Sequence, residues 1–239
     1  MESLKVNKSI IISWGSDLIA LLFPNLCNAC GRPIVQNEHL ICTKCLFDLP
    51  FTDYHIHHEN RVAKQLWGRL PLNAAMAMLY FRKGAKVQNL IHNLKYNNKT
   101  EVGILLGNLL GERLKSSPLY QAIDLVIPVP LHHKKLRLRG YNQSTFIAEG
   151  LAEKLNIPFR ENILIRTIST ESQTRKSRYN RYENMKEVFK IQNFEGVTDK
   201  HILLIDDVIT TGATLEACAN ALLAGGASKV SIAALAFAE

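Results

Sequence analysis

Apolar residues recur along the chain with two alternating periods, which predict strands and helices in turn. Short apolar runs predict strands at 74–81, 123–129, 163–165, 188–191, 202–205 and 229–237. Between them, apolar residues at helical spacing predict helices at 86–96, 102–114, 140–155 and 215–223. Strands that alternate with helices are typical of a parallel sheet flanked by helices. The pattern therefore predicts an α/β domain over residues 74–239.

The chain before residue 74 predicts three further segments. Residues 1–23 are expected to form an amphipathic helix, because their apolar stretch contains Asp17 and is too short to span a bilayer. A signal peptide is the alternative, although an A-x-A-like cleavage site is lacking. Residues 24–50 form a cysteine module, and residues 51–73 are expected to be a polar, solvated connector. No membrane span is predicted, so a cytoplasmic location is expected.

Four of the five cysteines form two C-x-x-C pairs, Cys27 with Cys30 and Cys42 with Cys45. Thiolates at this spacing can both face one tetrahedral metal ion, and two pairs complete its coordination. We therefore predict a structural Zn2+ site. A redox C-x-x-C is the alternative, although it needs no second copy, and disulfides do not suit a reducing cytosol. Cys218 stands apart and is expected to be a buried small apolar residue.

The strand predicted at 202–205 leads directly into two adjacent acids, Asp206 and Asp207, and a Thr/Gly-rich turn follows. Open α/β sheets bind ligands at the carboxyl ends of their strands, and a helix N-terminus favours an anion such as phosphate. The carboxylates can accept hydrogen bonds from sugar hydroxyls or hold a divalent cation. Together these parts suit a phosphorylated sugar. The alternative is an ordinary strand-to-helix turn in which Asp and Thr cap the helix.

This segment resembles the phosphoribosyl pyrophosphate motif of type I phosphoribosyltransferases. The resemblance implies that Asp206 and Asp207 contact the 2- and 3-hydroxyls of the ribose, and that the loop 210–214 holds its 5-phosphate. It also implies Mg2+ bound together with the pyrophosphate. The further ligand contacts that it implies in this segment are Val208, Thr210, Thr211, Gly212, Ala213 and Thr214.

Two basic stretches are expected at the same edge of the sheet. The chain has a formal net charge of +8, which permits anionic partners without selecting among them. The stretch 128–144 follows a strand, and its Arg137 and Arg139 suit a pyrophosphate. The stretch 166–186 has no clear period and is expected to be a lid, with Arg178 and Arg181 above the diphosphate. A solvated basic surface is the alternative for both stretches.

The cysteine pairs, Lys95 with Tyr96 after an apolar helix, and the run Arg-Gly-Tyr-Asn-Gln-Ser at 139–144 together resemble the ComF family. The resemblance extends from about Leu18 to the end of the chain. That family is described as an N-terminal zinc-binding module joined to a type I phosphoribosyltransferase domain. It is associated with uptake of single-stranded DNA in natural competence.

The resemblance implies a cytoplasmic, Mg2+-dependent phosphoribosyltransferase that binds phosphoribosyl pyrophosphate, with Lys95 among its ligand contacts. The sequence leaves the acceptor and the oligomeric state open. The alternative is a non-catalytic adaptor of the competence machinery that binds a nucleotide or single-stranded DNA and works with a helicase. Stacking of bases on tyrosines beside the basic stretches would suit such a role.

Overall fold

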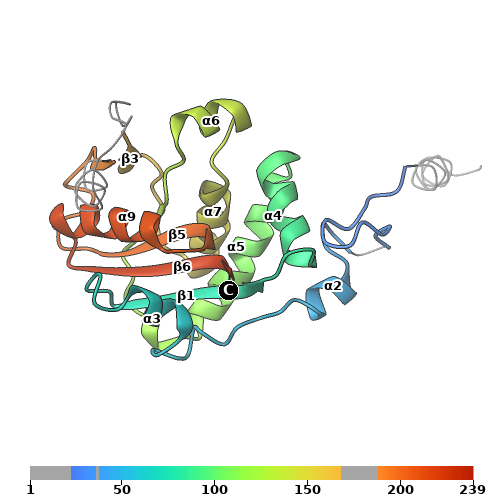
Figure 1. Ribbon diagram of the computed structural model, residues 1–239, viewed down its shortest axis with the longest axis horizontal. Helices are drawn as coiled ribbons and strands as arrows, with labels where there is room; N and C mark the ends of the chain where they lie inside the picture. Colours follow the sequence, from blue (N-terminus) through green and yellow to red (C-terminus); the bar gives the residue numbers. More distant parts are fainter. Residues whose placement is uncertain (1–22, 36–37, 168–187, 239) are drawn as a thin grey trace, which may run out of the picture. The chain divides into compact units, whose positions relative to one another are not determined.

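The computed structural model describes residues 23–35, 38–167 and 188–238, which fold as two units (Figure 1). The first unit is Met1–Leu49 and the second is Pro50–Glu239. In the first, helix α2 (Thr43–Phe47) follows two short bridges, Leu26 with Pro33 and His39 with Ile41. The helix expected over 1–23 lies outside the described residues except for Phe23. The domain boundaries expected from the sequence remain a prediction.

A parallel sheet of four strands forms the centre of the second unit, in the order β1-β6-β5-β2 (Figure 1). Its strands are β1 (Ala74–Phe81), β2 (Leu125–Pro128), β5 (His201–Ile209) and β6 (Lys229–Ala238). All three neighbouring pairs run parallel, so the predicted parallel sheet is confirmed. Strands β3 (Leu164–Arg166) and β4 (Phe189–Ile191) instead pair antiparallel in a separate two-stranded sheet.

Helices cover both faces of the parallel sheet (Figure 1). On one face lie α4 (Lys86–Tyr96), α5 (Thr100–Lys115) and α7 (Gln143–Leu155). Helices α5 and α7 approach each other so closely that a Cβ added at Gly107 would lie 2.2 Å from the carbonyl oxygen of Ile147. A 3-10 turn, η1 (Pro118–Tyr120), follows α5, and α6 (His133–Arg139) follows β2. The opposite face carries α9 (Ala213–Ala224).

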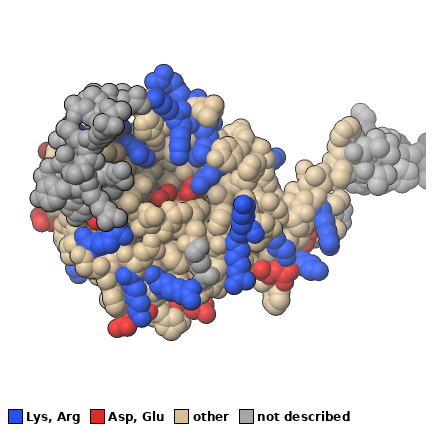
Figure 2. Space-filling model, viewed as in Figure 1, with Lys and Arg blue, Asp and Glu red and all other residues tan. Residues whose placement is uncertain are grey.

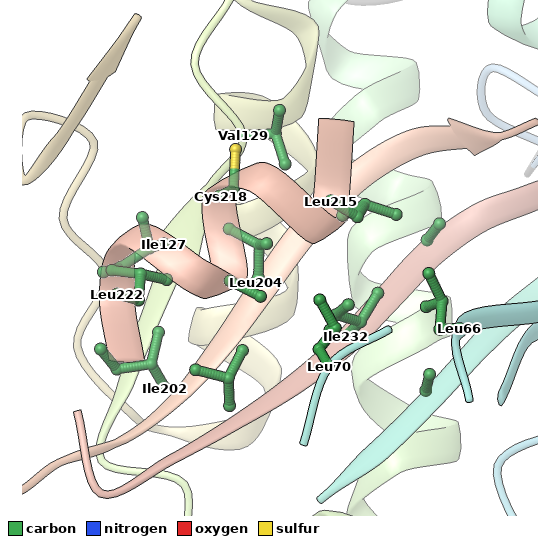
Figure 3. Packing of buried hydrophobic residues seen from close by; sticks show 14 of the residues in the cluster. Leu66, Leu70, Ile127, Val129, Ile202, Leu204, Leu215, Cys218, Leu222 and Ile232 are labelled. Atoms are coloured by element: carbon green, nitrogen blue, oxygen red, sulfur yellow. The ribbon is translucent and has the colours of Figure 1, made fainter. Parts of the chain in front are cut away.

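A buried apolar cluster joins α9 to the sheet (Figure 3). Leu215 and Leu222 of α9 belong to the same cluster as Leu204 of β5 and Ile127 of β2. Cys218 lies in the same cluster and is fully buried, as expected for a small apolar residue. The apolar runs of these strands are continuous because both faces of the sheet are covered. This packing fixes the carboxyl ends of β5 and β2 relative to the start of α9.

The segment 51–73, expected to be a solvated connector, contains helix α3 (Arg61–Leu66), which buries Val62, Ala63 and Leu66. Asn60 caps its first turn by accepting a hydrogen bond from the N–H of Ala63, 3.0 Å away. The same Asn60 side chain donates to the carbonyl oxygen of Ala75 in β1 at 2.8 Å. Leu66 and Leu70 enter the core beside Ile232 (Figure 3). The sequence prediction was wrong here because the apolar side of this short helix is hidden among charged and histidine residues.

Candidate functional site

The acid pair lies within the last part of β5. That strand was expected to end near Ile205, but it continues beside β6 as far as Ile209. On its other side, β2 ends at Pro128, which pairs with Ile205. Asp206 and Asp207 therefore extend beyond the end of their neighbour β2, at the carboxyl end of the sheet where open α/β sheets bind ligands.

The two carboxylates meet different partners. These partners come from two different helices, α7 and α4. The Asp206 carboxylate accepts hydrogen bonds from the Ser144 hydroxyl at 3.2 Å and from the backbone N–H of Asp207 at 2.8 Å. The Asp207 carboxylate forms an ion pair with the Lys95 ammonium of α4, with 2.8 Å between the atoms. The side chain of Asp207 is 6% exposed and that of Lys95 is 22% exposed.

The charge of this pair is only partly balanced. Burial, followed by the neighbouring charge of Asp207, raises the pKa of Asp206 from the ordinary value 3.8 to about 7. The hydrogen bond from the Asp207 N–H, the charge of Lys95 and the Ser144 hydroxyl act in the opposite direction but do not cancel it. Near neutral pH, Asp206 therefore exists in both protonation states. Perturbed carboxyl groups of this kind are common at functional sites.

The loop at 210–214 connects β5 to α9. Its Gly212 has φ +74° and stands at the N-cap position of α9, and a Cβ there would lie 2.8 Å from Leu66 Cδ2. Both the left-handed backbone and the close approach of Leu66 favour glycine at this position. The first N–H groups of a helix lack acceptors within it, so the start of α9 suits an anionic ligand.

Figure 2 shows this part of the surface as a hollow with acidic atoms at its floor and basic side chains beside and above it. The basic side chains above the hollow lie where Figure 1 draws α6. Arg137 and Arg139 belong to α6, which buries none of its side chains. Arg139 donates to the side-chain oxygen of Gln143, and its guanidinium lies 5.3 Å from the centre of the Tyr96 ring. Arg178 and Arg181 lie outside the described residues.

The loop 210–214 is also held by α3 and the turn after it, which sequence reasoning did not connect with the site. Gln65 donates to the carbonyl oxygen of Thr210 at 2.6 Å. Arg69 donates to the carbonyl oxygen of Thr211 at 3.1 Å and forms an ion pair with Glu216 in the first turn of α9. These residues precede the acid motif by more than a hundred positions, and their own segment contains no signal that would have linked them to it.

The four paired cysteines come together in the first unit. One sulfur from each lies within 4.8 Å of all the others, and Cys30 Sγ is 4.0 Å from Cys42 Sγ. Four thiolates around Zn2+, at about 2.3 Å each, need sulfur atoms about 3.8 Å apart. The Cys27 thiol is buried, which raises its pKa, but N–H groups of Cys42, Cys30 and Ala29 outweigh this and lower it to about 7. The cluster is therefore compatible with zinc.

Comparison with known proteins identifies the class of the second unit. Residues 142–239 match the phosphoribosyl transferase domain family. The glutamine phosphoribosylpyrophosphate amidotransferase of B. subtilis shares 20% sequence identity and a TM-score of 0.43, over 60% of this chain and 30% of that chain. That likeness is too low to inform the site. The parallel sheet and the domain match together define a phosphoribosyltransferase-type fold.

Curated relatives extend the match beyond this domain. Competence protein F of Haemophilus influenzae is 31% identical over 87% of this chain and 88% of its own length. DNA utilization protein YhgH of Salmonella typhi is 30% identical over 90% of this chain and 91% of its own length. The chain belongs to the ComF/YhgH family. Among the described residues, no helix is long and apolar enough to cross a membrane.

Proposed function

We propose that this protein binds phosphoribosyl pyrophosphate together with Mg2+ and acts as a phosphoribosyltransferase-type protein in DNA uptake or use. The observation that carries the proposal is the acid pair Asp206–Asp207 at the end of β5, directly beside a glycine-bearing loop that opens α9. A sugar with vicinal hydroxyls and a 5-phosphate has groups that fit both parts. The names of two relatives, a competence protein and a DNA utilization protein, support the biological setting.

The proposed binding mode assigns one ligand group to each part. Asp206 and Asp207 accept hydrogen bonds from the ribose hydroxyls, and such charge-assisted bonds contribute about 1.5–3 kcal/mol each. The loop 210–214 and the start of α9 bind the 5-phosphate. Arg137 and Arg139, in the last turn of α6, are assigned to the pyrophosphate. Mg2+ offsets the charge of that pyrophosphate when bound.

A transfer reaction at this site would displace pyrophosphate from C1 of the ribose by an acceptor. The developing positive charge at C1 and the negative charge on pyrophosphate need positioning and electrostatic stabilisation more than covalent help. The residues described above supply positioning at the hydroxyls and positive charge at the pyrophosphate. Lys95 contributes indirectly, because its ion pair balances the charge of Asp207.

Calorimetry with phosphoribosyl pyrophosphate and Mg2+ tests the proposal. The wild-type chain should bind, and the double variant Asp206→Asn/Asp207→Asn should bind at least tenfold more weakly. Glu153→Gln on the exposed side of α7 is the matched control for loss of a carboxylate and should bind as wild type does. Equal affinity of the wild type and the double variant would overturn the proposal.

The exposed helix α6 favours a second candidate function, binding of single-stranded nucleic acid. This helix carries four basic residues, and Tyr96 beside Arg139 is 65% exposed. Basic side chains that follow a phosphate backbone and an aromatic ring on which a base can stack are the usual elements of such sites. Affinity for a labelled single strand should fall as the salt concentration rises. Neutralising Arg137 and Arg139 together should reduce the slope of log affinity against log salt concentration by about 1.4. A flat salt dependence of the wild type would exclude direct binding.

A further inference from the structure

We infer that Gln65 and Arg69 are positioning residues for the phosphate end of this site, although they touch no proposed ligand group. The inference rests on the proposed function. The inference goes beyond the proposed function because it assigns the shape of the loop 210–214 to α3 and the turn that follows it. Both lie far before the phosphoribosyl transferase domain match of residues 142–239.

Two adjacent carbonyl groups of the loop are oriented from one side. Gln65 donates to the Thr210 carbonyl at 2.6 Å, and Arg69 donates to the Thr211 carbonyl at 3.1 Å. A peptide group is planar, so its carbonyl oxygen and the N–H of the next residue point in roughly opposite directions. Turning these two carbonyls toward α3 therefore turns the N–H groups of Thr211 and Gly212 away from α3. Those N–H groups are the kind of donors that a phosphate needs.

Arg69 also connects the loop to the helix that follows it. One of its nitrogens contacts the Thr211 carbonyl, and another forms the ion pair with Glu216 in the first turn of α9. The Glu216 side chain is only 8% exposed, so it faces Arg69 within the protein and not solvent. One planar guanidinium thus sets the loop and the start of α9 relative to each other through two nitrogens in a fixed fork, a geometry that a lysine ammonium lacks.

Close packing brings α3 to the loop at the same place. Leu66 lies between Gln65 and Arg69 in sequence and contacts Gly212, where a Cβ would come within 2.8 Å of it. Leu66 itself is buried in the core beside Ile232 (Figure 3). The position of α3 is in turn fixed by the hydrogen bond from Asn60 to the Ala75 carbonyl in β1. The loop is therefore held against a buried helix.

The discriminating variant is Arg69→Lys. It keeps the positive charge opposite Glu216 but loses the fork that reaches the Thr211 carbonyl. Gln65→Ala removes only the contact to Thr210. Lys64→Ala is the matched control on the same helix, because its ion pair with Glu59 is exposed and 3.8 Å long. Each variant is titrated with three probes: phosphoribosyl pyrophosphate with Mg2+, ribose 5-phosphate, and inorganic pyrophosphate with Mg2+. Thermal melting reports on folding.

Arg69→Lys and Gln65→Ala should each lower the affinity for ribose 5-phosphate at least fivefold. Their affinity for pyrophosphate should stay within twofold of wild type. Lys64→Ala should change neither affinity. The inference would be overturned if Arg69→Lys lost affinity for ribose 5-phosphate and pyrophosphate alike, or if neither variant lost affinity for ribose 5-phosphate. Either result would leave the proposed function standing. If the wild type binds neither phosphoribosyl pyrophosphate nor ribose 5-phosphate, the proposed function fails and the inference fails with it.

Discussion

Replacing Asp206 by Asn should stabilise the protein, and the gain should grow as the pH rises. The carboxylate of Asp206 lies beside Asp207, and burial together with that neighbouring charge raises its pKa from 3.8 to about 7. An amide has nearly the same shape, carries no charge, and can still accept the hydrogen bonds from Ser144 and from the Asp207 N–H. The substitution therefore removes the repulsion and keeps the contacts.

The sign of the pH effect follows from the direction of the pKa shift. Between 3.8 and about 7, the folded state holds a proton on Asp206 that the unfolded state has released. Stability contributed by this proton is fully present below the unfolded pKa and is lost as the pH rises through the folded pKa. A shift of about 3 units corresponds to about 4 kcal/mol. This value is an upper bound, because the protein and solvent relax around a buried charge and reduce its cost.

Urea denaturation of the wild type and Asp206→Asn at several pH values measures the effect. The gain in free energy of unfolding should be about 1–2 kcal/mol at about pH 5 and larger at about pH 8, where its upper bound is about 4 kcal/mol. Glu153→Gln, an exposed carboxylate on α7, should stay within about 0.5 kcal/mol of wild type throughout.

The neighbouring variant Asp207→Asn should have the opposite effect. It leaves the Lys95 ammonium without its ion pair in a place where only 22% of that side chain is exposed. Loss of one partner of a buried pair destabilises by about 3–5 kcal/mol, and partial exposure of Lys95 reduces this to about 1–3 kcal/mol. If Asp206→Asn is no more stable than wild type at about pH 8, or if its gain does not change with pH, the assignment of charge repulsion to this pair is refuted.

Three further outcomes follow from the geometry. Asn60→Ala should lower the free energy of unfolding by about 2–3 kcal/mol in urea, since it removes the cap of α3 and the donor to the Ala75 carbonyl. Gly212→Ala should destabilise by about 1–2 kcal/mol more than Gly84→Ala, because both have a left-handed backbone but only Gly212 has Leu66 against it. Equal losses of stability in the two glycine variants would contradict the close packing of Leu66 against Gly212. Chelation should release one Zn2+ per chain and make the four paired thiols reactive toward a thiol reagent, whereas buried Cys218 should stay unreactive in the folded protein.

Local periodicity was sufficient to place the main elements of the fold. The bounds 74–81 and 86–96 predicted from apolar spacing agree with β1 and α4. Both segments are strongly patterned: β1 is apolar throughout because it is buried, and α4 repeats Val87, Leu90, Ile91 and Leu94 along one side. The secondary structure of elements that bury most of one side can therefore be predicted from their own apolar pattern.

Shorter elements and the surroundings of the site could not be predicted in this way. Helix α3 has six residues, which is too few for a period to stand out from its charged neighbours. The hydrogen bond from Gln65 to Thr210 joins residues 145 positions apart, and no local pattern encodes such a contact. The continuation of β5 to Ile209 likewise depends on β6 running beside it. The sequence indicates which chemical groups the site contains, whereas tertiary packing decides what each one touches.

Because the contacts of the site residues depend on tertiary packing, the site requires more of the chain than the motif alone. The domain match begins at residue 142, after α3, β1, α4 and β2. Yet β2 is the neighbour that ends beside Ile205, just before Asp206, and α4 supplies the Lys95 that balances Asp207. Residues 142–239 thus contain the acid pair and the loop but lack the groups that set their charge and shape. The proposed site therefore draws on segments of Pro50–Glu239 that precede residue 142 as well as on the motif itself.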